Sequence, residues 1–525
     1  MRRLPVLATA LITLLPVTLL TTTGSASAAT ATLTVTTYDR TGAKLKAPLR
    51  LINLDSGAQY TATSLKAKKL PKGKYAVLTD IYSAKDGTDT LGARVLKVSG
   101  KTATTIDARR GRAIKVALDK IPDGQPYQEL RAQICANSSS SSTEIGAWNT
   151  PGKMFVIPNG SKSLRFAYNS AWSNSTTNSV WLVSAATKTV PAGVTRTWRT
   201  SSLATVRAVA KRGPAGSDQS DLRLEETSSC HAGYGVQAFS GRTPAVATFH
   251  VSPGKWQLSA NWWGTESTGN SAMMGFDNRN LTVVAGRSYG RSFFNAGWGP
   301  GRSLPRLYSN PARLRFDTSR MFTDPAYDLY SEASQRSKVT LYDSARKVVK
   351  SQWRTDWEGR GSDFSAKIKT KGWYTLQVDA QRYRPGIKHP ADMLSPRVQA
   401  IFRMKVDPKA KPRSADLILP RMVPTGLDMN NRARPGSSTV LEIRPDVRRK
   451  EVDLKLGKVT AKTVTTQVSF DGGKTWRSLT VRKSGTKWLA TIKNPASGAV
   501  ALRTRITTTK NAYAQVTIVR AYTVG

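Results

Sequence analysis

Short runs of alternating apolar and polar residues, separated by Gly, Pro and Asp, dominate this sequence. They are rich in Val, Thr, Tyr and Ile, and clear examples are residues 32–39, 74–82, 337–343, 373–381 and 515–524. An apolar side chain at every second position suits a strand with one buried face, and branched or aromatic side chains suit its pleated surface. The longest candidate helix, residues 126–136, has about three turns at most. The pattern therefore predicts an all-β protein made of antiparallel sandwiches.

Residues 1–28 are expected to be a signal peptide rather than part of the fold. The start MRR is positive, the apolar run after it is too short and too Thr-rich for a comfortable membrane span, and SASA supplies small residues for cleavage after Ala28. No cysteine directly follows the apolar run, so we expect no lipoprotein anchor, and the C-terminal RAYTVG lacks a hydrophobic tail. We therefore expect a secreted, extracellular protein with no membrane span after cleavage.

The length of 525 residues exceeds what one hydrophobic core usually organises, so several domains are expected. Polar or Pro-rich joints lie at 119–128, 299–311 and 407–420. The expected domains are a small β-sandwich at 29–120, a Trp-rich β domain at 121–303, a β-sandwich at 304–415 and a last β-sandwich at 416–525.

The chain has two cysteines, Cys135 and Cys230. In an oxidising compartment we expect them to form a disulfide within the Trp-rich domain. The alternative is a pair of buried thiols.

The formal net charge of +46 is spread along the chain rather than concentrated in a tail. Such a surface attracts polyanions over about a Debye length, and for an exported bacterial protein the nearest polyanions are the phosphate-rich polymers of the cell wall. Nucleic acid would bind without specificity, because no zinc finger, helix-turn-helix or RNA-recognition signature accompanies the charge. The alternative is that basicity only keeps a secreted protein soluble.

Signatures of catalysis are weak. The three histidines, His231, His250 and His389, form neither a helical pair nor a Cys/His cluster that would hold zinc. No G-x-S-x-G elbow surrounds a serine, and LDSG at 54–57 lacks the companion segments that a subtilase or an aspartic peptidase needs, so a tight turn explains it best. KDGTD at 85–89 does not have the ligand spacing of an EF-hand. We expect no catalytic, metal or cofactor site and no enzymatic activity.

Tryptophans suggest a ligand platform. Eight of the 13 lie between Trp148 and Trp298, and Trp262 and Trp263 are adjacent. In a strand, neighbouring residues face opposite sides, so one of this pair should enter the core and the other should face outward. An outward tryptophan near Asn261 and Glu266 could stack on a sugar ring or hold a peptide. The alternative is core or loop packing.

Residues 469–476, SFDGGKTW, match the pattern Ser-x-Asp-x-Gly-x-Thr-Trp known as the Asp-box, familiar from sialidases and related propellers. The box occurs once here, and each motif residue has a role in a hairpin. We expect the side chain of Asp471 to accept hydrogen bonds from the turn and Trp476 to pack beneath it. The expected structural hairpin consists of Ser469, Asp471, Gly473, Thr475 and Trp476.

Four segments resemble the non-catalytic C-terminal accessory region of large secreted subtilisin-like (S8 family) serine peptidases of Gram-positive bacteria. They are residues 70–119, residues 281–305, residues 338–351 with 373–382, and residues 464–481 with 500–522. The catalytic Asp, His and Ser segments of that family have no counterpart here, so the resemblance implies an accessory module without a peptidase domain. We expect the first domain to be prealbumin-like, of the transthyretin or carboxypeptidase-regulatory type, and the last to be Ig-like or fibronectin III-like with a single Asp-box hairpin.

The favoured function is therefore a secreted, non-catalytic binding or structural protein. Its expected partners are anionic cell-wall polymers, glycans or an extracellular protein, with wall association as a corollary. The alternative is an accessory or remnant of a secreted subtilisin-like system that acts with a separately encoded peptidase.

Overall fold

The computed structural model describes residues 30–525 apart from short segments. Left out are residues 123–126, 174–176, 214–218, 228–229, 231–234, 266–268, 270, 302–303, 310–311, 327–330, 333, 356–358 and 447–458. The expected signal peptide and Glu266 lie outside the described residues. Within them, the chain forms 39 strands and the 3-10 helices η1 (Ala108–Arg110), η2 (Thr200–Ser202) and η3 (Gly359–Ser362), with no α-helix. No helix in that part of the chain is long and apolar enough to cross a membrane. The predicted all-β sandwich class is confirmed.

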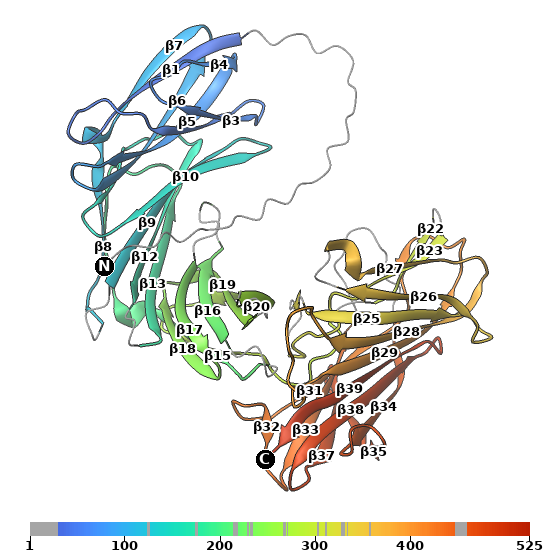
Figure 1. The fold of residues 1–525 in the computed structure, drawn as a ribbon. Coiled ribbons are helices and arrows are strands. Elements are labelled where there is room, and N and C mark those ends of the chain that lie inside the picture. The colour runs from blue at the N-terminus through green and yellow to red at the C-terminus, as the bar shows by residue number, and fades with distance from the viewer. Residues whose placement is uncertain are drawn as a thin grey trace.

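Three sheets form the N-terminal part of the molecule (Figure 1). In spatial order the first contains β4 (Lys68–Pro71), β1 (Thr30–Tyr38) and β7 (Lys101–Asp107). The second contains β14 (Val194–Trp198), β8 (Arg112–Leu118), β11 (Met154–Val156), β6 (Thr88–Val98), β5 (Gly73–Ser83), β2 (Pro48–Asn53) and β3 (Gln59–Thr63). The third contains β10 (Ser142–Asn149), β9 (Tyr127–Asn137), β12 (Leu164–Ser173), β13 (Ser179–Thr187), β18 (Ala245–Val251), β15 (Ala204–Ala210) and β21 (Ser288–Phe293).

The second sheet is buried on both faces, as β5 demonstrates. Tyr75 and Val77 belong to a core shared with the first sheet, whereas Ala76 and Leu78 belong to a core shared with the third sheet. Successive side chains of a strand point to opposite faces, so a strand that is apolar at both parities lies between two layers. The first three sheets are therefore stacked.

The third sheet also carries apolar residues on both faces. On β12, Trp172 packs in the core shared with the second sheet, whereas Ala171 packs in the next core. That core includes the fourth sheet, which contains β17 (Gly235–Arg242), β16 (Gln219–Glu226), β19 (Gly254–Thr265), β20 (Ser271–Val283) and β24 (Ser331–Glu332).

The C-terminal part contains three further sheets, drawn from yellow to red in Figure 1. The fifth contains β27 (Asp363–Lys367), β23 (Ala312–Asp317), β22 (Arg306–Ser309) and β30 (Arg413–Ser414). The nine-stranded sixth contains β26 (Val348–Thr355), β25 (Gln335–Tyr342), β28 (Gly372–Arg382), β29 (Arg397–Val406), β39 (Tyr513–Val524), β38 (Gly498–Thr508), β34 (Ala461–Ser469) and β35 (Arg477–Leu479), with β32 (Arg432–Ala433) also paired to β39. The seventh contains β31 (Leu419–Pro424), β33 (Ser438–Asp446), β37 (Lys487–Lys493) and β36 (Val481–Ser484).

One predicted segment has a different structure. The candidate helix at 126–136 is instead strand β9, in which Leu130, Ala132, Ile134 and Ala136 all face the core. These residues recur at every second position, which is the period of a strand, and β9 forms hydrogen bonds with β10 and β12 on its two sides. The helical interpretation was therefore wrong.

Hydrogen-bonded strand pairs cross all three predicted internal domain boundaries. Across residue 120, β14 pairs with β8 and β11 pairs with β6. Across residue 303, β24 pairs with β20, and across residue 415, β29 pairs with β39. The framework of sheets is therefore continuous through these joints. The division of the chain into four separate domains stays a prediction.

The predicted disulfide between Cys135 and Cys230 is confirmed. The two Cα atoms lie 5.7 Å apart, and the bridge joins β9 to a residue 95 positions later in the chain. Both cysteines are buried beside Ala167 of β12. Cys230 lies between β16 and β17 of the fourth sheet, so the bridge ties the third sheet to the fourth.

Replacing both cysteines by serine is expected to lower the free energy of unfolding by about 2–5 kcal/mol, because the bridge restricts a long loop of the unfolded chain. Urea unfolding followed by tryptophan fluorescence measures the change, and the wild-type protein with and without reductant is the control. An unchanged unfolding midpoint in the double variant would contradict this role.

Candidate functional site

Strands β10, β9 and β12 place three rows of side chains on one face of the third sheet. Residues directly opposite each other on paired strands project to the same face, so the register defines each row. The rows are Trp148, Arg131 and Asn169, then Gly146, Gln133 and Ala167, then Glu144, Cys135 and Arg165. Small residues flank Gln133 in the middle row, and one of them, Ala167, is buried against the disulfide.

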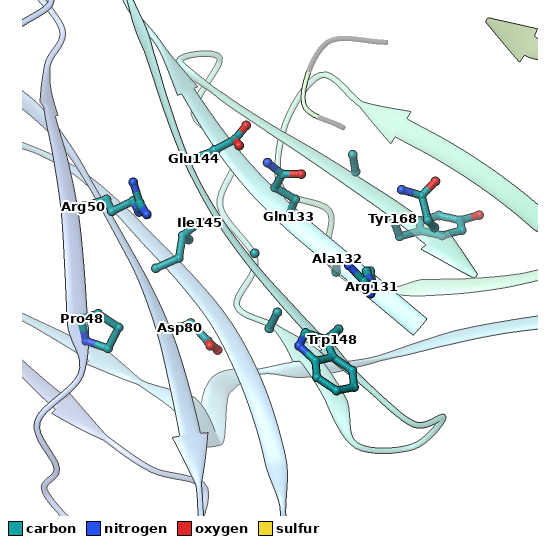
Figure 2. Close-up of a pocket in the computed structure, with 14 residues that line it drawn as sticks. Pro48, Arg50, Asp80, Arg131, Ala132, Gln133, Glu144, Ile145, Trp148 and Tyr168 are labelled. Atoms are coloured by element: carbon teal, nitrogen blue, oxygen red, sulfur yellow. The ribbon is translucent and has the colours of Figure 1, made fainter. Parts of the chain in front are cut away.

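A surface groove of about 460 Å³ begins on this strip and continues around the edge strand β10. Its far wall belongs to the second sheet, with Pro48 and Arg50 on β2 and Asp80 on β5. Figure 2 shows Ile145 directed toward the strand of Arg50, with Glu144 on the opposite side of β10. The volume falls in the range of small-ligand sites.

Trp148 exposes 64% of its surface in this groove. The guanidinium of Arg131 lies 5.8 Å from the centroid of the indole ring, and Glu129 holds it through an ion pair of 2.8 Å. A partly exposed ion pair adds little stability, but this one fixes the orientation of Arg131 beside the ring. The result is an open aromatic face bordered by hydrogen-bonding groups.

The hairpin of β9 and β10 is held against the second sheet by its tip. The hydroxyl of Ser141 donates to the carbonyl of Gly57 at 2.5 Å, and the Gln59 amide donates to the carbonyl of Ser142 at 2.9 Å. Gly57 belongs to the LDSG segment, which forms the turn between β2 and β3. Asn53 caps this turn by accepting the N–H of Asp55 at 2.9 Å. The groove is thus formed before any ligand arrives.

Asp80 is the groove residue whose pKa is shifted far from its ordinary value. Burial, and secondarily the nearby Asp89, raise the pKa of Asp80 to about 7. Burial also raises the pKa of Asp89, although the amide of Asn149 donates to its carboxylate at 2.7 Å. Both carboxyl groups lie on the face of the second sheet that meets β10, because Asp80 and Asp89 share the parity of Leu78 and Leu91.

The groove is lined by charged, polar, apolar and aromatic side chains. Among the described residues, no group of three or more His, Cys, Asp or Glu side chains could hold a metal ion. His250 lies elsewhere, stacked on Trp181 with ring centroids 4.8 Å apart, and His389 has a pKa lowered to about 4 by burial and by Arg382. His231 lies outside the described residues. The predicted lack of enzymatic activity stays a prediction.

Trp262 enters the core and does not line a groove. It is 1% exposed, and its ring contacts Phe294 at a centroid distance of 4.9 Å and Trp298 at 6.3 Å. The guanidinium of Arg382 lies 6.0 Å from the ring of Trp262. Trp262 therefore belongs to a buried aromatic cluster around an arginine from the C-terminal part.

The other members of the predicted platform are Trp263, Asn261 and Glu266. Trp263, on the opposite face of β19, is half-buried. The backbone N–H of Asn261 donates to Asp221 at 3.2 Å, and its carbonyl accepts the hydroxyl of Ser220 at 2.7 Å. Glu266 lies outside the described residues. A platform at this position stays a prediction, with Trp263 as its one outward ring.

The Asp-box forms a hairpin turn between β34 and β35. Asp471 accepts the N–H of Thr475 at 2.9 Å and the hydroxyl of Ser469 at 2.7 Å. The hydroxyl of Thr475 also donates to Asp471, and this hydrogen bond has the largest effect on its pKa. Together the hydrogen bonds hold the pKa of Asp471 well below its usual range. The indole N–H of Trp476 donates to the carbonyl of Gly473 at 2.9 Å, and φ of Gly473 is 93°, which favours glycine. All five motif residues therefore act within the turn.

The groove residues were not found from the sequence. The segment 142–149, STEIGAWN, did carry a signal, because a strand there places Glu144, Gly146 and Trp148 on one face. Arg131 was hidden by the mistaken helix at 126–136. Its place beside Trp148 and Asn169 depends on the register of three strands, which one sequence does not determine.

Comparisons with known proteins give no family. No protein-family model and no curated protein matches the chain. The FN1–FN3 domains of chicken CNTN1 are 10% identical over 60% of this chain and 96% of theirs, with a TM-score of 0.15. The BSP domain of a biofilm-associated protein is 9% identical over 78% of this chain and 96% of its own, with a TM-score of 0.15. An α-2-macroglobulin of Escherichia coli, activated by porcine elastase, is 9% identical over 94% of this chain and 53% of its own, with a TM-score of 0.12.

TM-scores of 0.15 and below carry no argument about function. The all-β class rests on the strand pairing described above. The resemblance to the accessory region of subtilisin-like peptidases is not tested by these comparisons and stays a prediction.

Replacing Asp80 by Asn is expected to flatten the pH dependence of stability. Because the pKa of Asp80 is about 7 in the native state and its ordinary value is 3.8, the native state holds the extra proton between these values. Stability should therefore fall as pH rises from about 4 to 7, by roughly 2–4 kcal/mol from this group. Thermal unfolding across this pH range compares wild type with Asp80→Asn, and equal slopes would contradict the assignment.

Replacing Trp262 by Ala is expected to lower the free energy of unfolding by about 3–5 kcal/mol, because it empties a fully packed site. The matched variant Trp263→Ala should cost less than half as much, since Trp263 is half-buried. Urea unfolding of the two variants measures the difference. Equal losses of unfolding free energy in the two variants would contradict the different burial of Trp262 and Trp263.

Proposed function

We propose that this protein is a secreted, non-catalytic binding protein whose layered β-sheets present a glycan-binding groove at Trp148. The ligand class is an extracellular saccharide polymer, with the anionic glycans of the cell wall as the favoured source. The exposed indole in a preformed polar groove is the single observation that carries this proposal.

The groove has the two kinds of group that sugar recognition needs. The flat, apolar face of Trp148 can pack against the C–H face of a pyranose ring, and an exposed aromatic with a polar border is suited to that contact. Arg131, Gln133 and Glu144 can donate to or accept from ring hydroxyls. Pockets that combine an apolar surface with a few convergent polar groups are the usual form of small-ligand sites.

The net charge of +46 supports an anionic polymer as the favoured source. Long-range attraction raises the local concentration of a polyanion around the whole chain and speeds its encounter with the groove. In the groove, Arg50 and Arg131 lie with Glu144 and with Asp80, whose pKa of about 7 leaves it partly protonated near neutral pH. Charge therefore attracts the polymer, whereas stacking and hydrogen bonds select the sugar.

Trp148→Ala is expected to weaken binding to soluble cell-wall glycan fragments about tenfold or more, as the loss of a central aromatic contact does in other interfaces. Titration followed by isothermal calorimetry measures the affinity, and quenching of tryptophan fluorescence reports the contact itself. The matched control is Trp353→Ala, because Trp353 is 53% exposed on β26, outside the groove.

Binding should also weaken between low and moderate salt in both the wild type and the Trp353 variant, because salt screens the general attraction. Equal affinity of the two tryptophan variants would overturn the groove as the site. Salt-independent binding, or none, would overturn the role given to charge.

A further inference from the structure

A second cavity of about 470 Å³ lies where four stretches of the chain meet the end of β39. Three arginines line it, Arg212, Arg432 and Arg520, and Asp392 lies among them. None of these residues belongs to the Trp148 groove. The cavity is called the arginine pocket below.

Arg520 is held in place by its backbone and its side chain. Its φ of 49° lies in the left-handed region that residues other than glycine seldom adopt. The carbonyl of Arg520 accepts the N–H of Ser395 at 2.9 Å, and its guanidinium donates to the carbonyl of Ala391. One cation of the pocket is therefore oriented before any ligand binds.

The backbones of Arg212 and Arg432 are anchored, but their guanidinium groups are not neutralised. The N–H of Arg212 donates to the carbonyl of Met429 at 2.9 Å, and the N–H of Arg432 donates to the carboxylate of Asp428 at 2.8 Å. Among the described residues, neither side chain has an ion-pair partner, whereas Arg444 pairs with Glu442 at 2.7 Å. Two cations thus remain available on fixed main-chain positions.

We propose that the arginine pocket binds a phosphate group, either free or as part of a phosphate-bearing polymer. A guanidinium presents parallel N–H donors that match the oxygens of a phosphate, and several of them around one cavity can surround a dianion. Three arginine side chains line the pocket, against the one acidic side chain of Asp392. This site is independent of the glycan proposal, because the two cavities share no residue.

A bound phosphate would connect parts of the chain that lie far apart in sequence. Arg212 precedes the fourth sheet, Asp392 follows β28, and Arg432 and Arg520 belong to β32 and β39. A ligand that contacts them together binds the native state and not the unfolded chain, so it must stabilise the fold. Phosphate should therefore raise the unfolding temperature as well as bind.

The test titrates the full chain with pyrophosphate by isothermal calorimetry at constant ionic strength, with inorganic phosphate and poly(glycerol phosphate) as further probes. Wild type should bind, and Arg432→Gln and Arg212→Gln should each weaken binding roughly tenfold or more, as loss of a charge-assisted contact does. The matched control is Arg434→Gln, because Arg434 is an exposed arginine two residues from Arg432 and outside the pocket. Its affinity should stay within about twofold of wild type, since only general attraction changes.

Three outcomes would overturn the proposal. Absence of pyrophosphate binding above a chloride control removes the site, and an equal loss in Arg432→Gln and Arg434→Gln assigns the binding to overall charge. Equal affinity for polyglutamate removes the preference for phosphate. Free phosphate and the polymer are distinguished by comparing inorganic phosphate with poly(glycerol phosphate). Trp148→Ala should bind pyrophosphate as wild type does, so failure of the glycan groove leaves this test intact.

Discussion

The buried guanidinium of Arg382, on β28 of the sixth sheet, joins the C-terminal part of this molecule to the fourth sheet. It lies 4.6 Å from the ring centroid of Phe322, 5.4 Å from that of Trp298 and 6.0 Å from that of Trp262. Its Nε donates to the carbonyl of Ser395 at 3.1 Å. A cation removed from water is costly unless its surroundings replace the lost hydration, and removing one partner of such a group is more damaging than never burying it. The rings and the arginine therefore have to assemble together.

The segment beside this cluster extends the same constraint to the last sheets. The N–H of Ala296 donates to the buried side chain of Asn431 at 3.0 Å, and the N–H of Gly297 donates to the carbonyl of Ala521 at 2.9 Å. Gly297 has φ of 87°, and a Cβ there would lie 3.1 Å from the carbonyl oxygen of Met422. The positive φ favours glycine, and any other side chain would also crowd this carbonyl oxygen. Three of the stretches predicted as separate domains meet at this joint, which explains why strand pairing also crosses their boundaries.

Local chemistry made the strands, the disulfide and the Asp-box hairpin predictable, because each depends on residues close in sequence or on a unique pair. The alternation rule also separated the two faces of the Trp262 and Trp263 pair. It could not say which ring enters the core, because that depends on Arg382, a residue far along the chain. The Trp148 groove was missed for the same reason: its rows depend on cross-strand register, and register is specified by the packed sheets as a whole.

The distribution of charge around the two cavities explains how a strongly basic chain can still select a ligand. A net charge of +46 acts on any polyanion, and its reach is about 8 Å at physiological ionic strength. Selection must therefore come from short-range contacts, and the two cavities offer different ones: stacking and balanced hydrogen bonds in the Trp148 groove, and uncompensated guanidinium groups in the arginine pocket. A polymer that carries both sugar rings and phosphates would satisfy both. Because continuous sheets and the Arg382 cluster hold the cavities on one scaffold, attachment at one would raise the effective concentration of the polymer at the other wherever its length spans the two.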